Sequence, residues 1–338
     1  MTPEKNTTIE QMNVEMTPQE APDTARPLWL LSTGVLLTVL FAGSFFLSDP
    51  KSEVTPGDIE VSLTSQDYTG SFQNLNLKAK AAYVYDVAHG RALFAANEES
   101  QLPLASLTKV MTAIVATESL SYDSIVSVDA SALGLEGDSG LFMDEQWRAR
   151  DLLDFMLLVS SNDSASALAS AAGAVVMTAE AAGTKVDSHE TFLRRMNEKA
   201  EEIGLAQTYF LNETGLDTSE AVSGGYGSAR DMALLLSYAL KNTPEALDAT
   251  SYPALAFTSL SQITHEVENT NEIVGKIPGL IASKTGYTTL AGGNLVIAFD
   301  AGVNRPIIIS VLGSTREGRF SDVEQLIGAT LSALEKTN

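Results

Sequence analysis

The stretch PLASLTKVMTA, residues 103–113, carries the pattern that decides the fold. Ser106 and Lys109 are three residues apart at the start of an apolar run, so a helix would place them on one face, a single turn apart. A neutral amine beside a hydroxyl can accept the hydroxyl proton, and burial or a second nearby cation would favour the neutral lysine. The pair therefore predicts a covalent serine enzyme that uses a lysine as its base.

Taken alone, the Ser-x-x-Lys spacing is a weak signal. Ser106 is also a candidate helix N-cap, a position at which serine is favoured. Ser48 and Lys51 have the same spacing, but the Asp-Pro between them indicates a turn beside an apolar segment. Other elements of the chain have to decide between a helix cap and a nucleophile.

Two such elements follow in order. Ser160 and Asn162 form a Ser-x-Asn element directly after the apolar stretch 152–159, and residues 284–286 read Lys-Thr-Gly after another apolar stretch. The order Ser-x-x-Lys, Ser-x-Asn, Lys-Thr-Gly is typical of class A β-lactamases and penicillin-binding proteins. Three short elements in this order are far more specific than any one of them.

Composition and charge exclude several classes of protein. The 338 residues, 44% of them hydrophobic, allow one large domain or two modest ones. A formal net charge of −22 argues against nucleic acid or an anionic lipid surface as a partner. The absence of cysteine excludes disulfides and thiolate metal sites. His89, His189 and His265 lie in polar or turn-like contexts without ligand spacing, so we expect all three at the surface and neither a metal nor a cofactor.

The segment 28–47 contains no charged residue and has about the length needed to cross a bilayer. A cleaved signal peptide usually has an apolar stretch of about 7–15 residues followed by a small-x-small site, whereas here Ala42-Gly43-Ser44 lies inside the run. A buried core helix is a further alternative, but both flanks are polar and rich in proline or glycine. We therefore expect an uncleaved transmembrane anchor, with a signal peptide as the alternative.

The anchor divides the chain. Residues 1–27 are predicted to be a disordered cytoplasmic tail, 48–75 a linker, and 76–338 a serine peptidase domain. Arg26 beside the N-terminal end of the span gives a slight positive-inside bias. The expected location is therefore the cell membrane, with a single span and the catalytic domain outside the cytoplasm.

The globular part has strands at both ends and helices between them. Residues 80–95 predict a hairpin with its turn at 88–91. Apolar spacing predicts helices at 106–119, 149–159, 163–176, 190–203, 228–241 and 319–335, strands at 280–284, 294–299 and 306–312, and a surface excursion at 177–189. An antiparallel sheet built from the two ends, with helices flanking it and forming a second lobe, satisfies this order. Function then belongs at the seam between sheet and lobe.

At this point the chain resembles the low-molecular-mass penicillin-binding proteins, the serine D-alanyl-D-alanine carboxypeptidases of peptidase family S11. The resemblance covers about residues 75–335 and extends to YFLNETGLD (209–217), SARDMALL (228–235), ENTNEI (268–273) and AGGNLV (291–296). It implies the α/β penicillin-recognising fold, of β-lactamase and transpeptidase type, which agrees with the two-lobed prediction.

The resemblance also implies roles for individual residues. Ser106 corresponds to the acylated nucleophile and Lys109 to its base. Ser160 could pass a proton to the leaving amine, and Asn162 could hold the peptide carbonyl of the substrate. Lys284 adds positive charge that would help keep Lys109 neutral and position Ser160.

Further carried-over roles concern the other wall of the site. Thr285 would contact the terminal carboxylate of the substrate or its equivalent in a penicillin. Gly286 would let the substrate approach the strand, and the backbone N–H of Tyr287 would join that of Ser106 as an oxyanion donor. Arg319 resembles the arginine that attracts the terminal carboxylate. Arg316 is a competing candidate, and an exposed arginine at a helix start is the plain alternative.

The implied function is a D-Ala-D-Ala carboxypeptidase that trims peptidoglycan stem peptides through an acyl-enzyme on Ser106 and is inhibited by β-lactams. Only residues 287–338 follow the Lys-Thr-Gly element, so we expect no C-terminal β-domain, and a D,D-endopeptidase of cross-links remains an alternative. A class A β-lactamase would need Glu-x-x-Leu-Asn, and the nearest match, 202–206, ends in alanine. A non-catalytic wall-binding module is the alternative from another class.

Overall fold

The computed structural model describes residues 61–62, 70–179, 187–302 and 304–336. All of them lie in one compact unit, Glu53–Asn338. The predicted tail 1–27 and anchor 28–47 lie outside the described residues. Within the described ranges, no helix combines the length and hydropathy that a membrane crossing requires.

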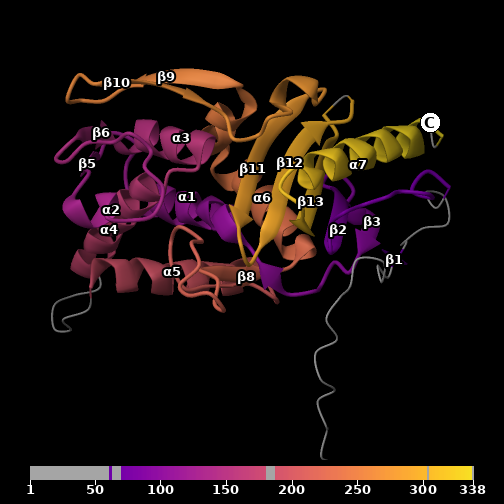
Figure 1. Cartoon of the computed structure of the whole chain (residues 1–338), viewed down its shortest axis with the longest axis horizontal. Coiled ribbons are helices and arrows are strands. Elements are labelled where there is room, and N and C mark those ends of the chain that lie inside the picture. Colours follow the sequence, from indigo (N-terminus) through magenta and orange to yellow (C-terminus); the bar gives the residue numbers. More distant parts are fainter. Residues whose placement is uncertain (1–60, 63–69, 180–186, 303, 337–338) are drawn as a thin grey trace, which may run out of the picture. The chain divides into compact units, whose positions relative to one another are not determined.

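A six-stranded antiparallel sheet is built from the two ends of the described chain (Figure 1). Its order is β1-β3-β2-β13-β12-β11, with β1 at Val61–Ser62, β2 at Ala81–Asp86, β3 at Arg91–Ala96, β11 at Leu280–Thr288, β12 at Gly292–Asp300 and β13 at Pro306–Ser314. The central pairing of β2 with β13 sets Val84 opposite Ile309, so the N-terminal hairpin joins the C-terminal strands directly. The predicted antiparallel sheet from both ends is confirmed.

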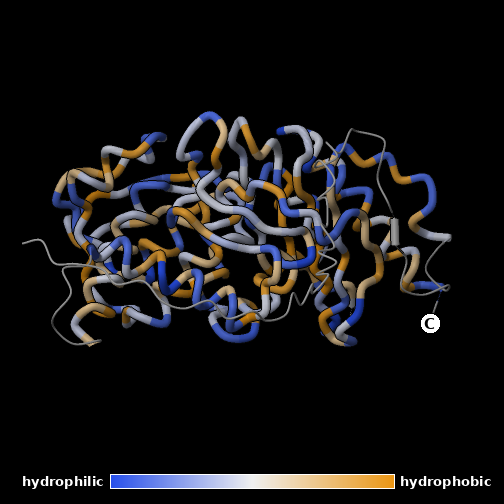
Figure 2. Tube along the Cα trace, turned by 90° about the horizontal axis from the view of Figure 1, so that it is seen from below, coloured by the Kyte–Doolittle hydropathy of each residue, from blue (hydrophilic) through white to orange (hydrophobic). Residues whose placement is uncertain are grey.

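Both faces of this sheet are buried, and successive residues of a strand serve different cores. On β12, Val296 and Ala298 pack with the helical lobe, whereas Leu295 and Ile297 pack against the C-terminal helix on the other face. This follows from the period of two along a strand. Most hydrophobic stretches of the trace run through the interior in Figure 2, and hydrophilic ones gather at the outer turns.

The α-helices lie close to where apolar spacing predicted them, except for the short α2, which was not predicted. The lobe contains α1 at Thr108–Ser119, α2 at Ala130–Leu133, α3 at Ala149–Val159, α4 at Asn162–Ala179, α5 at Ser188–Ile203 and α6 at Ala229–Asn242, and α7 at Gly318–Glu335 covers the far face of the sheet. Three short 3₁₀ helices, η1 at Ala105–Leu107, η2 at Pro244–Ser251 and η3 at Val274–Lys276, complete them. Most of the predicted surface excursion, residues 180–186, lies outside the described residues.

Three small sheets were not predicted. In the first, β8 (Gly225–Gly227) lies between β4 (Leu102–Pro103) and β7 (Tyr209–Phe210) and pairs with both. The second pairs β5 (Ile125–Ser127) with β6 (Gln146–Arg148), and the third pairs β9 (Ala254–Thr258) with β10 (Thr264–Glu268). Their strands are two to five residues long, too short for a period of two to stand out in the sequence.

The packed unit also extends upstream of residue 76, into the segment predicted as a linker. β1 pairs with β3, with Val61 opposite Ala96. Phe72 is buried and its ring stacks on that of Phe94, with the ring centroids 5.2 Å apart. The polar composition of residues 48–75 predicted a linker and gave no sign of either contact.

The expectation that all three histidines lie at the surface is wrong for His265. Its side chain is buried, its Nε2 lies 2.8 Å from a carboxylate oxygen of Glu145, and its ring packs against Trp147 and Phe155. The alternation of β10 turns this one residue inward although its sequence neighbours are exposed. His89 is exposed beside Asp86, and His189 is half-buried.

Candidate active site

Ser106 and Lys109 meet as their spacing predicted, at the junction of η1 and α1. Lys109 Nζ lies 3.1 Å from Ser106 Oγ. Ser106 is not a helix cap, because Leu107 occupies the N-cap position of α1 and Leu104 that of η1, and neither makes a side-chain cap. The hydroxyl is therefore free for chemistry. Ala105, the residue before it, has φ of 49°, a strained backbone conformation of the kind that clusters at active sites.

The amine of Lys109 is fully buried and has two further partners. Nζ donates to Asn162 Oδ1 and to the carbonyl oxygen of Thr214, at 2.7 Å each. Burial lowers the pKa of Lys109 to about 7, against the opposing pull of the Glu213 and Asp163 carboxylates. A neutral amine has two N–H bonds, which these two oxygens accept. The lone pair is then left for the Ser106 hydroxyl, the arrangement that a general base requires.

Ser160 and Asn162 occupy the corner between α3 and α4. α3 ends at Val159, Ser160 adopts a left-handed conformation with φ of 64°, and Ser161 Oγ accepts from the backbone N–H of Ser164 to cap α4. The strained corner turns Ser160 into the cleft. The Asn162 side chain is also fixed by the backbone of Glu136, because its Nδ2 donates to the Glu136 carbonyl oxygen at 2.6 Å. One of its two amide hydrogens is therefore committed to protein, which leaves the other for a substrate.

Lys284 lies on β11, the strand at the edge of the sheet. Its Nζ donates to Ser160 Oγ and to the carbonyl oxygen of Thr285, at 2.9 Å each. Burial lowers the pKa of Lys284 well below its ordinary value, and the charges of Lys109 and Arg319 lower it further. Two buried amines at one site titrate as a pair, so both are rarely charged together. The family resemblance implied that Lys284 would help keep Lys109 neutral. In the structure, burial is the main cause of the lowered pKa of each lysine.

The sheet approaches the nucleophile segment closely at Gly286. A side-chain carbon added there would lie 2.9 Å from the carbonyl oxygen of Leu104 and 3.2 Å from the backbone nitrogen of Ser106. Asn294, which faces Gly286 on β12, donates from Nδ2 to the carbonyl oxygens of Pro103 and Leu104. The absence of a side chain at Gly286 thus permits the contact between β11 and the nucleophile segment, and the hydrogen bonds of Asn294 stabilise it. The role of Asn294 was not predicted, although the stretch that contains it was singled out.

The far end of the site collects hydroxyl and guanidinium groups. Thr285 Oγ1 lies 2.6 Å from Oγ1 of Thr270, a residue that sequence reasoning did not assign to the site. Arg319 is buried, not exposed at its helix start, and its Nη1 donates to the carbonyl oxygen of Gly286 at 2.9 Å. Arg316 is exposed and lies over the ring of Tyr287, 5.1 Å from its centroid. Both arginines therefore belong to the cleft.

Most of these groups line one cleft of about 410 Å³ between β11 and the helical lobe, but Lys109, Asn162 and Lys284 are not among its lining residues. Its volume suits a short peptide or a small bicyclic ligand. Among the described residues, no cluster of histidine and carboxylate side chains could hold a metal ion. The cleft is lined by Ser106, Ser160, Glu268, Asn269, Thr270, Glu272, Thr285, Gly286, Tyr287, Arg316 and Arg319.

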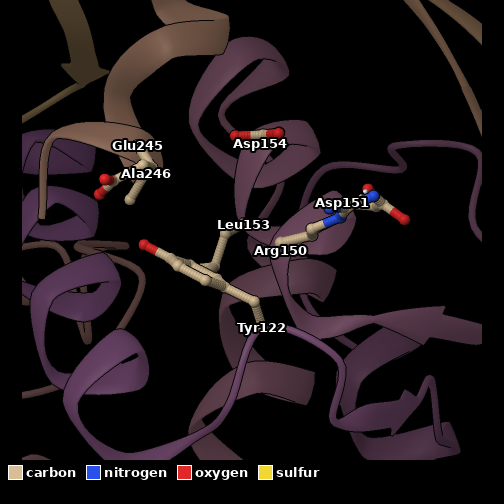
Figure 3. Close-up of a pocket in the computed structure, with 7 residues that line it drawn as sticks. All are labelled: Tyr122, Arg150, Asp151, Leu153, Asp154, Glu245 and Ala246. Carbon is tan, nitrogen blue, oxygen red and sulfur yellow. Dashed lines mark hydrogen bonds and ion pairs between the residues drawn. The ribbon is translucent and has the colours of Figure 1, made fainter.

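A second cavity, of about 370 Å³, lies beside α3 and η2 (Figure 3). Tyr122, Arg150, Asp154 and Glu245 are among its lining residues, and none of the predicted site residues is. Burial raises the pKa of Asp154 to about 7, assisted by the nearby Asp151 carboxylate. This cavity is therefore a separate feature from the cleft that contains Ser106.

Comparison with known proteins agrees with this geometry. The model of the D-alanyl-D-alanine carboxypeptidase family, peptidase family S11, matches residues 68–316. The chain belongs to this family. The family predicted from the sequence motifs and the penicillin-recognising fold are thereby confirmed.

Individual relatives are more distant. The D-alanyl-D-alanine carboxypeptidase DacB2 of Mycobacterium tuberculosis is 30% identical over 71% of this chain and 77% of its own. DacF of Bacillus subtilis is 29% identical over 76% of this chain, which spans only 63% of that relative's length. The ampicillin-bound structure of penicillin-binding protein D2 from Listeria monocytogenes is 31% identical, with a TM-score of 0.62 over 76% of this chain and 98% of the other.

Proposed function

We propose that this chain is a serine-type D-Ala-D-Ala carboxypeptidase that trims peptidoglycan stem peptides and is acylated by β-lactams. One observation carries the proposal: the Ser106 hydroxyl lies 3.1 Å from a buried lysine amine whose pKa is about 7. Membership of the D-alanyl-D-alanine carboxypeptidase family and the likeness to an ampicillin-bound penicillin-binding protein support the substrate and the inhibitor class.

In the first step, Ser106 Oγ attacks the carbonyl carbon of the peptide bond between the two D-alanines, and its proton passes to Lys109 Nζ. The backbone N–H groups of Ser106 and Tyr287 stabilise the oxyanion that forms. The C–N bond then breaks as the leaving amine takes the hydroxyl proton of Ser160, whose Oγ lies 2.9 Å from Lys284 Nζ. The proton held on Lys109 replaces it, so Lys109 is neutral again. D-alanine departs, and the acyl group remains on Ser106 as an ester.

In the second step, water replaces the amine. Lys109 Nζ accepts a proton from the water, whose oxygen attacks the ester carbonyl. Lys109 then returns that proton to Ser106 Oγ as it leaves, which restores the free enzyme. The terminal carboxylate of the substrate would be held by Thr285 Oγ1 and by the positive charges of Arg319 and Arg316. A β-lactam places its own carboxylate there and leaves an acyl group on the same serine.

The test is covalent labelling followed by product analysis. A fluorescent penicillin should label the wild type and not Ser106→Ala, and mass spectrometry of a purified pentapeptide should show loss of one D-alanine. Equal labelling of both proteins would contradict the assignment of Ser106. Release of a monomer from a cross-linked dimer, with the pentapeptide left intact, would instead favour the D,D-endopeptidase.

Rapid turnover of a chromogenic β-lactam would favour the β-lactamase alternative, against which the structure supplies an observation. Glu202, the nearest match to a deacylating glutamate, lies near the end of α5, paired with Arg195 and Lys199. It is not among the residues that line the cleft. The absence of any acylation would favour the non-catalytic wall-binding module.

We also propose that residues 28–47 anchor the protein in the cell membrane, with the catalytic domain outside the cytoplasm. An uncharged stretch of this length and the location of peptidoglycan support it. The N-terminal residue of protein extracted from membranes tests it. An N-terminus at position 45 or later would show that the segment is a cleaved signal peptide.

A further inference from the structure

An ionic pair outside the lining of the cleft, Glu213 with His189, carries a charge that acts on Lys109. Glu213 follows β7, and its side chain is only 12% exposed. One of its carboxylate oxygens lies 3.4 Å from Nδ1 of His189, in the first turn of α5. Ser166 on α4 also hydrogen-bonds the carboxylate. Neither Glu213 nor His189 lines the cleft or takes part in the acylation steps above.

The backbone of Glu213 is attached directly to the helix that carries the proposed base. Thr112 Oγ1 donates to the carbonyl oxygen of Glu213 at 2.6 Å, and Lys109 Nζ donates to the next carbonyl oxygen, that of Thr214, at 2.7 Å. Thr112 and Lys109 are one turn apart on α1, so two consecutive carbonyl groups are held by one helix face.

The same segment is fixed on its other side. Asn212 Oδ1 accepts from the backbone N–H groups of Thr214 and Gly215. At Gly215 an added side-chain carbon would lie 1.9 Å from the carbonyl oxygen of Ala105, the residue before the nucleophile. The Glu213 carboxylate is therefore held in a fixed place relative to both Ser106 and Lys109.

We propose that Glu213 and His189 form a positioning pair that sets the pH range over which Lys109 can act as the base. The inference rests on the role of Lys109 proposed above. Glu213 contributes a buried negative charge that favours the protonated amine, and His189, when protonated, cancels that charge. The pair thus acts through Lys109 and touches no substrate.

The charged groups around each member agree with this scheme. Lys109 is faced by the carboxylates of Glu213 and Asp163, which raise its pKa, and by the amine of Lys284. Burial alone would raise the pKa of Glu213, but the hydrogen bond and charge of His189 hold it below its usual value.

His189 is stabilised in its charged form in return. Its hydrogen bond to Glu213 raises its pKa above the usual value in spite of burial, and the charges of Glu213, Asp187 and Asp129 add to this. Near neutral pH the pair is therefore largely an ion pair with little net charge. As His189 loses its proton, the charge of Glu213 is uncovered and Lys109 holds its own proton more tightly.

Two substitutions should shift the activity in opposite directions. Glu213→Gln removes the negative charge, so the acid limb of the acylation rate should move down by about half a pH unit. His189→Asn leaves Glu213 uncompensated, so the limb should move up by about the same amount, which is about threefold in rate on that limb. The measurement is the second-order rate of acylation by a fluorescent penicillin from pH 5 to pH 9, with full-length protein.

The control is Glu201→Gln, the same change of charge on the exposed side of α5, which should leave the limb in place. Shifts in the same direction for Glu213→Gln and His189→Asn, or a uniform loss of rate without a shift, would overturn the proposal in favour of a structural role. If Glu213→Gln did not fold, His189→Asn would decide alone, and an unmoved or lowered limb would refute the pairing.

A readout independent of activity is the pKa of His189 measured by NMR. It should fall in Glu213→Gln, and it should rise in Lys109→Met, because two coupled protonations oppose each other equally in both directions. An unchanged His189 pKa in both variants would overturn the coupling. A wild type without any acid limb would contradict the base role of Lys109 itself, whereas a limb that is present and unmoved would contradict only this inference.

Discussion

Replacement of Gly286 by alanine should separate folding from acylation. The added methyl group would lie 2.9 Å from the carbonyl oxygen of Leu104, 3.2 Å from the backbone nitrogen of Ser106 and 3.3 Å from the Ala105 side chain. The first contact is shorter than side-chain carbons tolerate and its partner is backbone, so β11 and the nucleophile segment must move apart. Two hydrogen bonds from Asn294 to Pro103 and Leu104 resist that movement.

The magnitudes follow from overpacking and from loss of alignment. Inserting a methyl group into a packed contact costs about 1–3 kcal/mol of the free energy of unfolding. The oxyanion donors proposed here lie on the two sides of this contact, at Ser106 and Tyr287. Misplacing one such donor costs roughly 10²–10³-fold in rate. We expect Gly286→Ala to acylate about 10²-fold more slowly than the wild type while it stays folded at 25 °C.

The assay is the rate of acylation by a fluorescent penicillin, with the free energy of unfolding measured in parallel by urea denaturation. The control is Gly328→Ala in the middle of α7, where the added carbon meets nothing within 4 Å and should stabilise the helix by about 0.5–1 kcal/mol. A Gly286→Ala protein that acylates at the rate of Gly328→Ala would refute the close approach of β11 to the nucleophile.

Four further outcomes are expected. Lys109→Arg should lose acylation whereas Lys284→Arg should retain more of it, because a guanidinium cannot act as a base near neutral pH; equal rates in the two variants would contradict the division of roles. With the pKa of Lys109 at about 7, wild-type acylation should fall about tenfold from pH 8 to pH 6. Between about pH 7 and the ordinary pKa of 10.5, the unfolded chain binds more protons at Lys109 than the folded chain does. Lys109 therefore makes the free energy of unfolding rise with pH in that range. Urea denaturation at a series of pH values should show this rise in the wild type, and the contribution should be missing in Lys109→Met. Arg319→Ala should raise KM about tenfold or more for a peptide with a free terminal carboxylate, and an equal effect on the amidated peptide would refute its role.

Much of the architecture could be read from local patterns. The apolar spacing of residues 149–159 predicted α3 without error in its bounds, because an amphipathic helix of this length repeats its signal several times. The strands of the main sheet were found for a similar reason, although β11 and β12 begin or end a few residues beyond the predictions. Paired strands as short as β4 and β8 gave no usable pattern, since the pairing of Leu102 with Gly227, 227 − 102 = 125 positions away, leaves no local trace.

The histidines show where local context fails. His265 lies between exposed residues of a short strand and has polar sequence neighbours, yet its ring is buried against Trp147 and its Nε2 meets Glu145. The partner is 120 positions away, so neither the burial nor the carboxylate could be inferred from the neighbouring residues. The pairing of His189 with Glu213 likewise could not be inferred from the residues next to either of them in the sequence.

The sequence by itself determined which groups can do the chemistry and in what order they occur. One turn of helix is enough to bring a hydroxyl at position 106 beside an amine at 109, because that distance depends only on helix geometry. Only the tertiary structure decided the proton affinity of that amine. The hydrogen-bond partners of Lys109, the carbonyl oxygen of Thr214 and the amide of Asn162, come from distant parts of the chain. A pKa responds to neighbours in space rather than in sequence.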